Sequence, residues 1–145
     1  MQKINIFSLQ THLGEYKNWP LKTLLQKNGE STTTYLPGYE VLYQFELPAG
    51  EYLLITDWDC PFEEATEFIL LDSTLKILAK RKLAVPYGSF LLENLQVLNE
   101  HTIHLEFDNK DYWQLSVMPK PARTSPFFNL NWLPIFKDRL QLKRL

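Results

Sequence analysis

The residues best suited to chemistry lie together at positions 57–64, which read DWDCPFEE. This segment combines four carboxylates with the single cysteine of the chain, Cys60. A thiol is nucleophilic only as the thiolate, and neighbouring carboxylates disfavour that anion. We therefore predict that Cys60 is a small apolar residue rather than a nucleophile.

The carboxylates of this segment are better candidates for a site. Asp57 and Asp59 are two positions apart and share a face if a strand continues that far, so they could bind a divalent metal. However, the segment lacks the glycine and the alternating ligand spacing of a calcium loop. A paired-carboxylate hydrolase needs a cleft that keeps one carboxyl group neutral, which the sequence does not indicate. Two interpretations remain open: a solvated acidic rim on a sheet edge, or recognition of a cationic partner.

The histidines do not predict a reaction centre. His101 and His104 are three positions apart on a predicted strand, so their side chains leave opposite faces and are not placed to bind one metal. His12 stands alone, and the chain has no glycine-rich phosphate loop, nucleotide fingerprint or Ser/His/Asp arrangement. We therefore expect a non-enzymatic protein with no catalytic residues, no metal and no cofactor.

Charge is distributed unevenly along the chain. Residues 28–75, the lysine-free stretch, contain no lysine or arginine, although the formal net charge of the whole chain is only −2. If this stretch folds onto one surface, it would attract a cationic partner and repel nucleic acid. Its carboxylates belong to Glu30, Glu40, Glu46, Glu51, Asp57, Asp59, Glu63, Glu64, Glu67 and Asp72.

Length and composition indicate one domain over residues 1–145. A chain of 145 residues can bury a core without disulfides, and a single cysteine fits a reducing compartment. The start of the chain lacks the apolar core of a signal peptide, and no apolar run reaches the roughly 18 residues of a membrane span. We therefore expect a cytoplasmic protein that does not enter a membrane.

Alternation with a period of two predicts an antiparallel β body over residues 39–118. Its first strand should place four apolar side chains on one face: Val41, Tyr43, Phe45 and Leu47. A turn at 48–50 then leads into a returning strand at 51–58. Further strands are predicted at 66–71, 75–83 and 89–93.

The clearest hairpin pairs residues 101–108 with 112–118, where Ile103, Leu105 and Phe107 alternate with polar residues. Short turns without intervening helical patterns favour antiparallel pairing over a parallel sheet. We therefore predict a mostly β fold, arranged as an antiparallel β-sandwich or an open barrel.

The N-terminal segment 1–38 has a mixed pattern. Asn18 and Pro20 predict the cap and the first turn of a short helix, with leucines along one side. The pair Asn28-Gly29 would end this helix.

The C-terminal segment 119–145 is expected to be a docking tail. Its aromatic and apolar residues at 127–136 are too apolar to remain in water, which predicts that they pack across the sheet. Residues 135–145 would then form a short basic helix opened by Pro134.

Nucleic-acid binding is an alternative for a sheet that exposes aromatic residues. Lys76, Lys80 and Lys82 would share one face of a strand, and the C-terminal tail adds further cations. The acidic stretch opposes this interpretation because it would repel phosphates. Direct binding of RNA or DNA is therefore not expected.

Together, these features favour a protein whose function is to bind another protein. Trp and Tyr are enriched in the energetic centres of interfaces, and surrounding charges steer the encounter. The first hypothesis is a bacterial immunity protein that inhibits a cationic toxin domain, with a nuclease as the expected target because its phosphate-binding groove is basic. The predicted contact residues are Asp57, Trp58, Asp59, Glu63, Glu64 and Glu67.

Two further hypotheses come from other classes of function. One is a ligand-binding β module whose aromatic side chains stack on carbohydrate or on single-stranded nucleic acid. The other is a metal-dependent hydrolase centred on Asp57 and Asp59, which predicts a thermal shift on addition of a divalent metal. A toxin gene immediately upstream would favour the immunity hypothesis over both.

Overall fold

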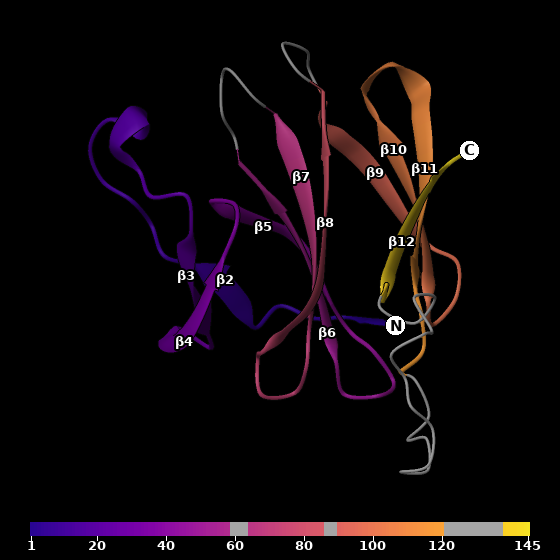
Figure 1. Cartoon of the computed structure of the whole chain (residues 1–145), viewed down its shortest axis with the longest axis horizontal. Helices are drawn as coiled ribbons and strands as arrows, with labels where there is room; N and C mark the ends of the chain where they lie inside the picture. The colour runs from indigo at the N-terminus through magenta and orange to yellow at the C-terminus, as the bar shows by residue number, and fades with distance from the viewer. Residues whose placement is uncertain (59–63, 86–89, 121–137) are drawn as a thin grey trace, which may run out of the picture.

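The computed structural model describes residues 1–58, 64–85, 90–120 and 138–145. These residues form three antiparallel sheets, which confirms the prediction of a mostly β protein (Figure 1). The sheets lie as layers, with a five-stranded central sheet between a three-stranded and a four-stranded sheet.

The strands are distributed among the sheets as follows. The central sheet has the order β1-β5-β6-β7-β8 and contains β1 (Gln2–Lys3), β5 (Glu40–Glu46), β6 (Tyr52–Asp57), β7 (Ala65–Leu71) and β8 (Ile77–Ala84). The three-stranded sheet contains β2 (Phe7–Leu9), β3 (Thr23–Lys27) and β4 (Glu30–Leu36) in that order. The four-stranded sheet has the order β12-β11-β10-β9 and contains β9 (Leu92–Val97), β10 (Thr102–Phe107), β11 (Asp111–Val117) and β12 (Leu140–Arg144). The short 3-10 helices η1 (Tyr16–Asn18) and η2 (Asp108–Lys110) complete the described elements.

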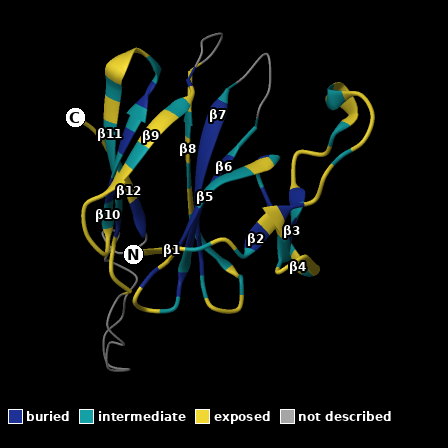
Figure 2. Ribbon diagram, turned by 180° about the vertical axis from the view of Figure 1, so that it is seen from behind, coloured by how far each residue is buried: buried dark blue, intermediate teal, exposed yellow. Residues whose placement is uncertain are grey.

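Each face of the central sheet carries its own hydrophobic core, because alternate residues of β6 and β7 point to opposite sides. The core toward the four-stranded sheet includes Phe45, Leu53, Ile55, Phe68, Leu70, Ile103, Leu105, Phe107 and Leu115. The core toward the three-stranded sheet consists of Phe7, Leu9, Leu25, Leu36, Leu54, Ile69 and Leu71. All of β7 is buried (Figure 2), so its apolar residues run consecutively instead of alternating.

A β-bulge changes the predicted face of β5. Tyr43 and Phe45 pack toward the four-stranded sheet as predicted, whereas Val41 packs against the opposite core. The register shifts between Val41 and Tyr43, and one extra residue in a strand moves the preceding side chains to the other face. The turn predicted at 48–50 is confirmed, with Gly50 at a φ of +75°.

The structure confirms the predicted late hairpin, both in the positions of its strands and in the side chains that face the core. β10 and β11 pair from Thr102↔Ser116 to Phe107↔Asp111. Alternate residues of β10 are buried, beginning with Ile103, as the sequence pattern requires.

The prediction of an N-terminal helix is wrong. The segment forms the β3–β4 hairpin, in which Asn28 (φ +52°) and Gly29 (φ +80°) are the two-residue turn rather than a helix stop. Asn-Gly suits both roles because each needs a left-handed residue, and the burial of Leu25 as part of a strand decides between them. Only η1 remains near the predicted cap.

The prediction of a C-terminal helix over residues 135–145 is also wrong for residues 138–145, the part of this segment that the structure describes. β12 pairs with β11 from Val117↔Leu140 to Trp113↔Arg144. Leu140 is buried while its neighbour in the strand is exposed, which is the period of a strand. The aromatic residues predicted to dock at 127–136 lie outside the described residues.

The other predicted strands differ mainly in their bounds. β7 and β8 correspond to the strands predicted at 66–71 and 75–83, joined by a turn at Asp72. The strand predicted at 89–93 overlaps β9 only at its start, since β9 begins at Leu92 and continues to Val97.

Candidate functional site

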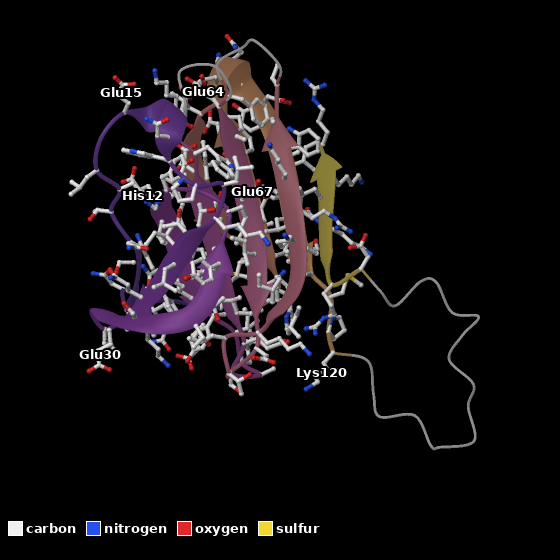
Figure 3. The ribbon with its side chains drawn as sticks, turned by 60° about the vertical axis from the view of Figure 1, so that its left-hand side comes forward. His12, Glu15, Glu30, Glu64, Glu67 and Lys120 are labelled. Carbon is white, nitrogen blue, oxygen red and sulfur yellow. The ribbon has the colours of Figure 1, made fainter. Side chains whose placement is uncertain are left out.

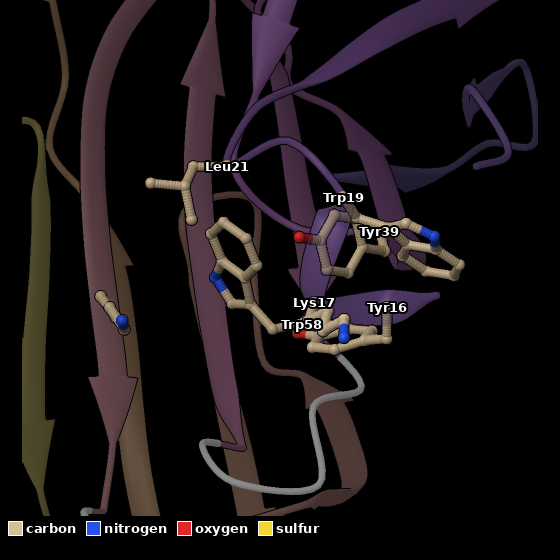
Figure 4. Close-up of a pocket in the computed structure, with 7 residues that line it drawn as sticks. Tyr16, Lys17, Trp19, Leu21, Tyr39 and Trp58 are labelled. Carbon is tan, nitrogen blue, oxygen red and sulfur yellow. The ribbon is translucent and has the colours of Figure 1, made fainter. Parts of the chain in front are cut away.

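The three-stranded sheet does not cover the whole of its side of the central sheet. At one end of this face, Thr56, Glu67 and Lys82 lie side by side on β6, β7 and β8, and Lys82 is exposed. Residues around η1 and the residue before β5 extend over this end and border an open surface cavity of about 250 Å³ (Figure 4). The cavity is lined by Tyr16, Lys17, Trp19, Leu21, Tyr39, Trp58 and Lys82.

Four rings form the aromatic cluster of this cavity: Tyr16, Trp19, Tyr39 and Trp58. Tyr39 lies at its centre, with ring centroids 5.6 Å from Tyr16 and 5.1 Å from both Trp19 and Trp58. The interplanar angles are 88°, 84° and 84°, so all three contacts are edge-to-face. Rings in edge-to-face contact do not cover one another's faces. Ring faces of different orientation therefore surround the cavity.

Hydrogen bonds hold the long connection between β2 and β3 in place beneath these rings. Trp19 Nε1 donates to the carbonyl oxygen of Gly14 at 3.2 Å, and the Tyr39 hydroxyl donates to the carbonyl oxygen of Pro20 at 2.9 Å. The Thr23 hydroxyl, which is buried, donates to the carbonyl oxygen of Gly38 at 2.7 Å. The connection is therefore held at its β3 end and tied within itself between Trp19 and Gly14, which positions the rings before any ligand binds.

Gly38 sets the approach of Tyr39 to the central sheet. It has a φ of +101°, and a Cβ at this position would lie 2.6 Å from Thr56 Oγ1. Only glycine combines this conformation with such a close approach. As a result, the Tyr39 amide donates to the carbonyl oxygen of Asp57 at 2.7 Å, next to Trp58.

Two of the predicted contact residues contact each other: Trp58, which lines the cavity, and Glu67, which does not. Trp58 Nε1 donates to Glu67 Oε1 at 3.0 Å, and Glu67 is only 7% exposed. The carboxylate therefore orients the indole rather than facing solvent. Sequence reasoning selected both residues but missed Tyr16 and Trp19, whose signal was the high density of aromatic residues between positions 16 and 19.

Asp57 and Glu64 lie at the same end of the central sheet but not in the cavity lining. Asp57 belongs to the opposite face from Glu67, in register with Thr66. Glu64 Oε2 accepts a hydrogen bond from the amide of Phe90 at 2.7 Å. Asp59 and Glu63 lie outside the described residues, and the role of all the predicted residues in partner binding stays a prediction.

The lysine-free stretch does not gather its carboxylates on one surface. Glu30 and Glu64 lie at opposite ends of the molecule (Figure 3). Glu51 is buried and pairs with Arg139 at 2.7 Å between Oε1 and Nη2. Antiparallel strands return the chain at each turn, so acidic residues near successive turns alternate between the two ends. The closeness of these carboxylates in the sequence therefore wrongly predicted one continuous acidic patch.

A second group of carboxylates, the strand-end acids (Glu93, Glu106 and Asp108), was not singled out by the sequence. The pKa of Glu93 is raised, first by its hydrogen bond with Asp108, then by desolvation and by repulsion from Asp108 and Glu106. The pKa of the Tyr112 hydroxyl is also raised, chiefly by the charge of Glu106, to which it donates at 3.2 Å. These shifts indicate a locally negative potential.

The strand-end acids lie near Glu64. Asp108 Oδ2 accepts from the amide of Leu91 at 3.4 Å, and the preceding amide, that of Phe90, donates to Glu64. The acidic character of this end thus comes from segments far apart in the sequence, which an inspection of one continuous stretch could not find.

The described ranges contain no group of three or more His, Cys, Asp and Glu residues that could hold a metal ion. His101 is exposed, while His104 Nε2 lies 3.3 Å from Gln114 Oε1. In the same ranges, no helix is long and apolar enough to cross a membrane.

Comparison of the chain with protein-family models, with curated proteins and with solved structures gives no match in any of the three. The site geometry is therefore the basis for a functional assignment.

Proposed function

We propose that this chain is a non-enzymatic inhibitor that binds a toxin domain, in the manner of a bacterial immunity protein, and that the aromatic cluster is the centre of its contact surface. The observation that carries the proposal is the convergence of two Trp and two Tyr side chains around one cavity at the surface. Trp and Tyr dominate the energetic centres of protein interfaces, and pre-positioned rings lose little entropy on binding.

The end of the molecule that carries the cluster is also acidic on its other side. The strand-end acids and Glu64 lie at this end, with the strand-end acids on the four-stranded sheet, and create a negative potential there. Such a potential speeds the encounter with a cationic surface more than it adds affinity. A nuclease is the favoured target, because the groove that binds its phosphates is cationic.

The predicted contact residues take distinct roles in this proposal. Trp58 belongs to the centre, and Glu67 positions it. Asp57 and Glu64 belong to the acidic end of the molecule rather than to the cavity, and Asp59 and Glu63 stay predicted contacts. The inhibitor would act in the bacterial cytoplasm by covering the substrate groove of the toxin, which requires no reaction centre of its own.

Co-expression tests this function. The C-terminal domain encoded by the gene immediately upstream would be expressed in bacteria alone, with this chain, and with its Trp58→Ala/Tyr16→Ala variant. We expect the domain to arrest growth, the chain to restore it, and the variant to restore it poorly at equal expression. A non-toxic upstream domain, or arrest that the chain does not relieve, would contradict the proposal.

A ligand-binding module is the second candidate, because a cavity of about 250 Å³ walled by aromatic rings and bordered by Lys17 and Lys82 also suits a sugar ring or a nucleobase. Tryptophan fluorescence during titration with oligosaccharides and with a single-stranded oligonucleotide separates the two functions. Saturable binding that the Tyr16→Ala variant abolishes, in a protein that does not bind the toxin domain, would favour this candidate.

A further inference from the structure

We infer that the cavity of the aromatic cluster binds a small planar aromatic anion, that is, one ring system that carries a phosphate or carboxylate group. This inference goes beyond the proposed function, because it concerns a ligand that the isolated chain would bind without the toxin domain. Two properties of the described lining lead to it. The polar atoms of three of its rings are already used by the protein, and its charged groups are two ammonium groups.

The aromatic rings offer flat surfaces rather than hydrogen-bonding groups. Trp19 Nε1 donates to a backbone carbonyl oxygen, and Trp58 Nε1 donates to Glu67. The Tyr39 hydroxyl donates to the carbonyl oxygen of Pro20. An indole has no other polar atom, so an occupant meets mainly ring faces and ring edges. A planar ring packs on such surfaces whatever its substituents.

A sugar fits this lining less well than an aromatic ring. Each sugar hydroxyl both donates and accepts, and a buried hydroxyl without a partner costs free energy. The described residues of the lining include no Asp, Glu, Asn or Gln, the side chains that could serve several hydroxyls at once. The cavity volume of about 250 Å³ suits one ring system with its substituent, because it lies below the roughly 300–1,000 Å³ of sites for drug-sized ligands.

The two lysines of the lining supply the contact with the anion. Lys17 Nζ lies 2.9 Å from Glu15 Oε2, but the two side chains are 76% and 71% exposed, so water screens this pair. Lys82 lies opposite Glu67 in the register of β7 and β8 and also has a partner. An ammonium group has three donors, so each lysine can keep its present partner and still donate to a phosphate or carboxylate.

The described carboxylates of the same end do not border the cavity. The strand-end acids lie on the four-stranded sheet, beyond the opposite face of the central sheet. Glu64 accepts from the amide of Phe90, a residue of the core on that opposite side. Because Coulomb interactions weaken with distance, an occupant of the cavity interacts more strongly with the two ammonium groups than with these acids.

The possible occupants respond differently to the removal of a lysine. If an aromatic anion binds, Lys82→Met weakens binding by about twofold to fivefold, as expected for one partly exposed charge contact. If a neutral ring binds, the same change has little effect. If a cation binds, the change strengthens binding, because it removes a repulsive charge.

The experiment is an NMR titration of the ¹⁵N-labelled full chain at pH 7 with two anions, each beside its neutral counterpart. Indole-3-acetate is compared with indole-3-acetamide, and adenosine 5′-monophosphate with adenosine. We expect saturable shifts of the indole N–H resonances of Trp19 and Trp58 with at least one anion, and binding at least about threefold weaker for its neutral counterpart. The indole of Trp113, which donates to Asp111 on β11, is the internal control and should not move.

The variants complete the test. Lys17→Met and Lys82→Met should each weaken binding of the anion, whereas Lys143→Met, which removes an exposed lysine of β12, should not change it. Tighter binding of the nucleotide or of the indole carboxylate supports the inference in either case and identifies which source of the ligand the cavity prefers.

Three results would overturn the inference: no saturable shift of either indole, equal binding of the neutral counterparts, or affinities that neither Lys17→Met nor Lys82→Met lowers. These results leave the growth-rescue experiment unaffected. Failure of the aromatic anion is therefore distinguishable from failure of the proposed function.

Discussion

The two faces of the central sheet are covered to different extents. Toward the four-stranded sheet, the core residues Phe68, Ile103 and Phe107 are completely buried. Toward the three-stranded sheet, Leu25 and Ile69 are equally buried, but this core does not extend to one end of the central sheet. At that end the aromatic cluster covers the central sheet instead of a further strand, and its four side chains are only partly buried.

We propose that this difference separates stability from recognition. A fully covered face contributes through burial, at roughly 25 cal/mol per Å² of apolar surface, and has no surface left for a partner. A face that is left partly open retains aromatic area whose burial can still be gained on binding. Hydrogen bonds hold Trp58, Trp19 and Tyr39 and keep this aromatic area ordered.

The largest effect is expected from the ion pair that closes the covered side. Arg139 Nη2 donates to Glu51 Oε1, and Arg139 Nε donates to the carbonyl oxygen of Met118, both at 2.7 Å. Arg139→Met leaves Glu51 buried without its cation and should lower the free energy of unfolding by about 3 to 5 kcal/mol in a urea titration. The double variant Glu51→Met/Arg139→Met should recover most of this loss. An unaltered midpoint for the single variant would show that the pair is not needed to hold β12.

On the open side, Gly38→Ala should reduce the free energy of unfolding by about 2 kcal/mol more than Gly14→Ala. Both glycines have a positive φ, but a Cβ meets Thr56 Oγ1 at 2.6 Å at Gly38 and meets nothing within 4 Å at Gly14. The difference therefore isolates the clash from the backbone strain. The variant should also quench or shift the fluorescence of Trp58, because Tyr39 must move. Equal effects of the two substitutions would argue against a close approach of this turn to β6.

The smallest effect concerns the strand-end acids. Because the pKa of Glu93 is raised in the folded protein, its charge destabilises the fold above that pKa, and this cost disappears as the pH falls through the raised pKa toward the usual 4.5. Wild type should therefore gain stability relative to Glu93→Gln between pH 7 and pH 4.5. Urea midpoints of the two proteins at both pH values measure the gain. A constant difference would mean that the carboxylates do not repel one another.

Much of the fold could be predicted because alternation is a local signal. The hairpin of β10 and β11 and the turn before Gly50 follow from period two and from turn residues. The N-terminal helix was wrong because Asn28-Gly29 suits a hairpin turn as well as a helix stop, and only tertiary packing of Leu25 decides.

The site was less predictable because it depends on strand register. Asp57 and Glu67 fall on opposite faces of the sheet, and Glu51 is neutralised by a residue 88 positions away. Neither relation is visible along the chain. Trp58 lines the cavity, but the sequence singled it out as a partner contact for its acidic neighbours rather than for the rings that surround it, and that role stays a prediction.

Affinity for the proposed toxin domain tests the proposed role of the aromatic cluster most directly. Calorimetric titration would compare wild type with Tyr16→Ala, in the cavity lining, and with Tyr35→Ala, a tyrosine on β4 that is 54% exposed. The account predicts at least about a tenfold loss of affinity for Tyr16→Ala and no significant change for Tyr35→Ala. Equal affinities of all three proteins, or a loss confined to Tyr35→Ala, would contradict it.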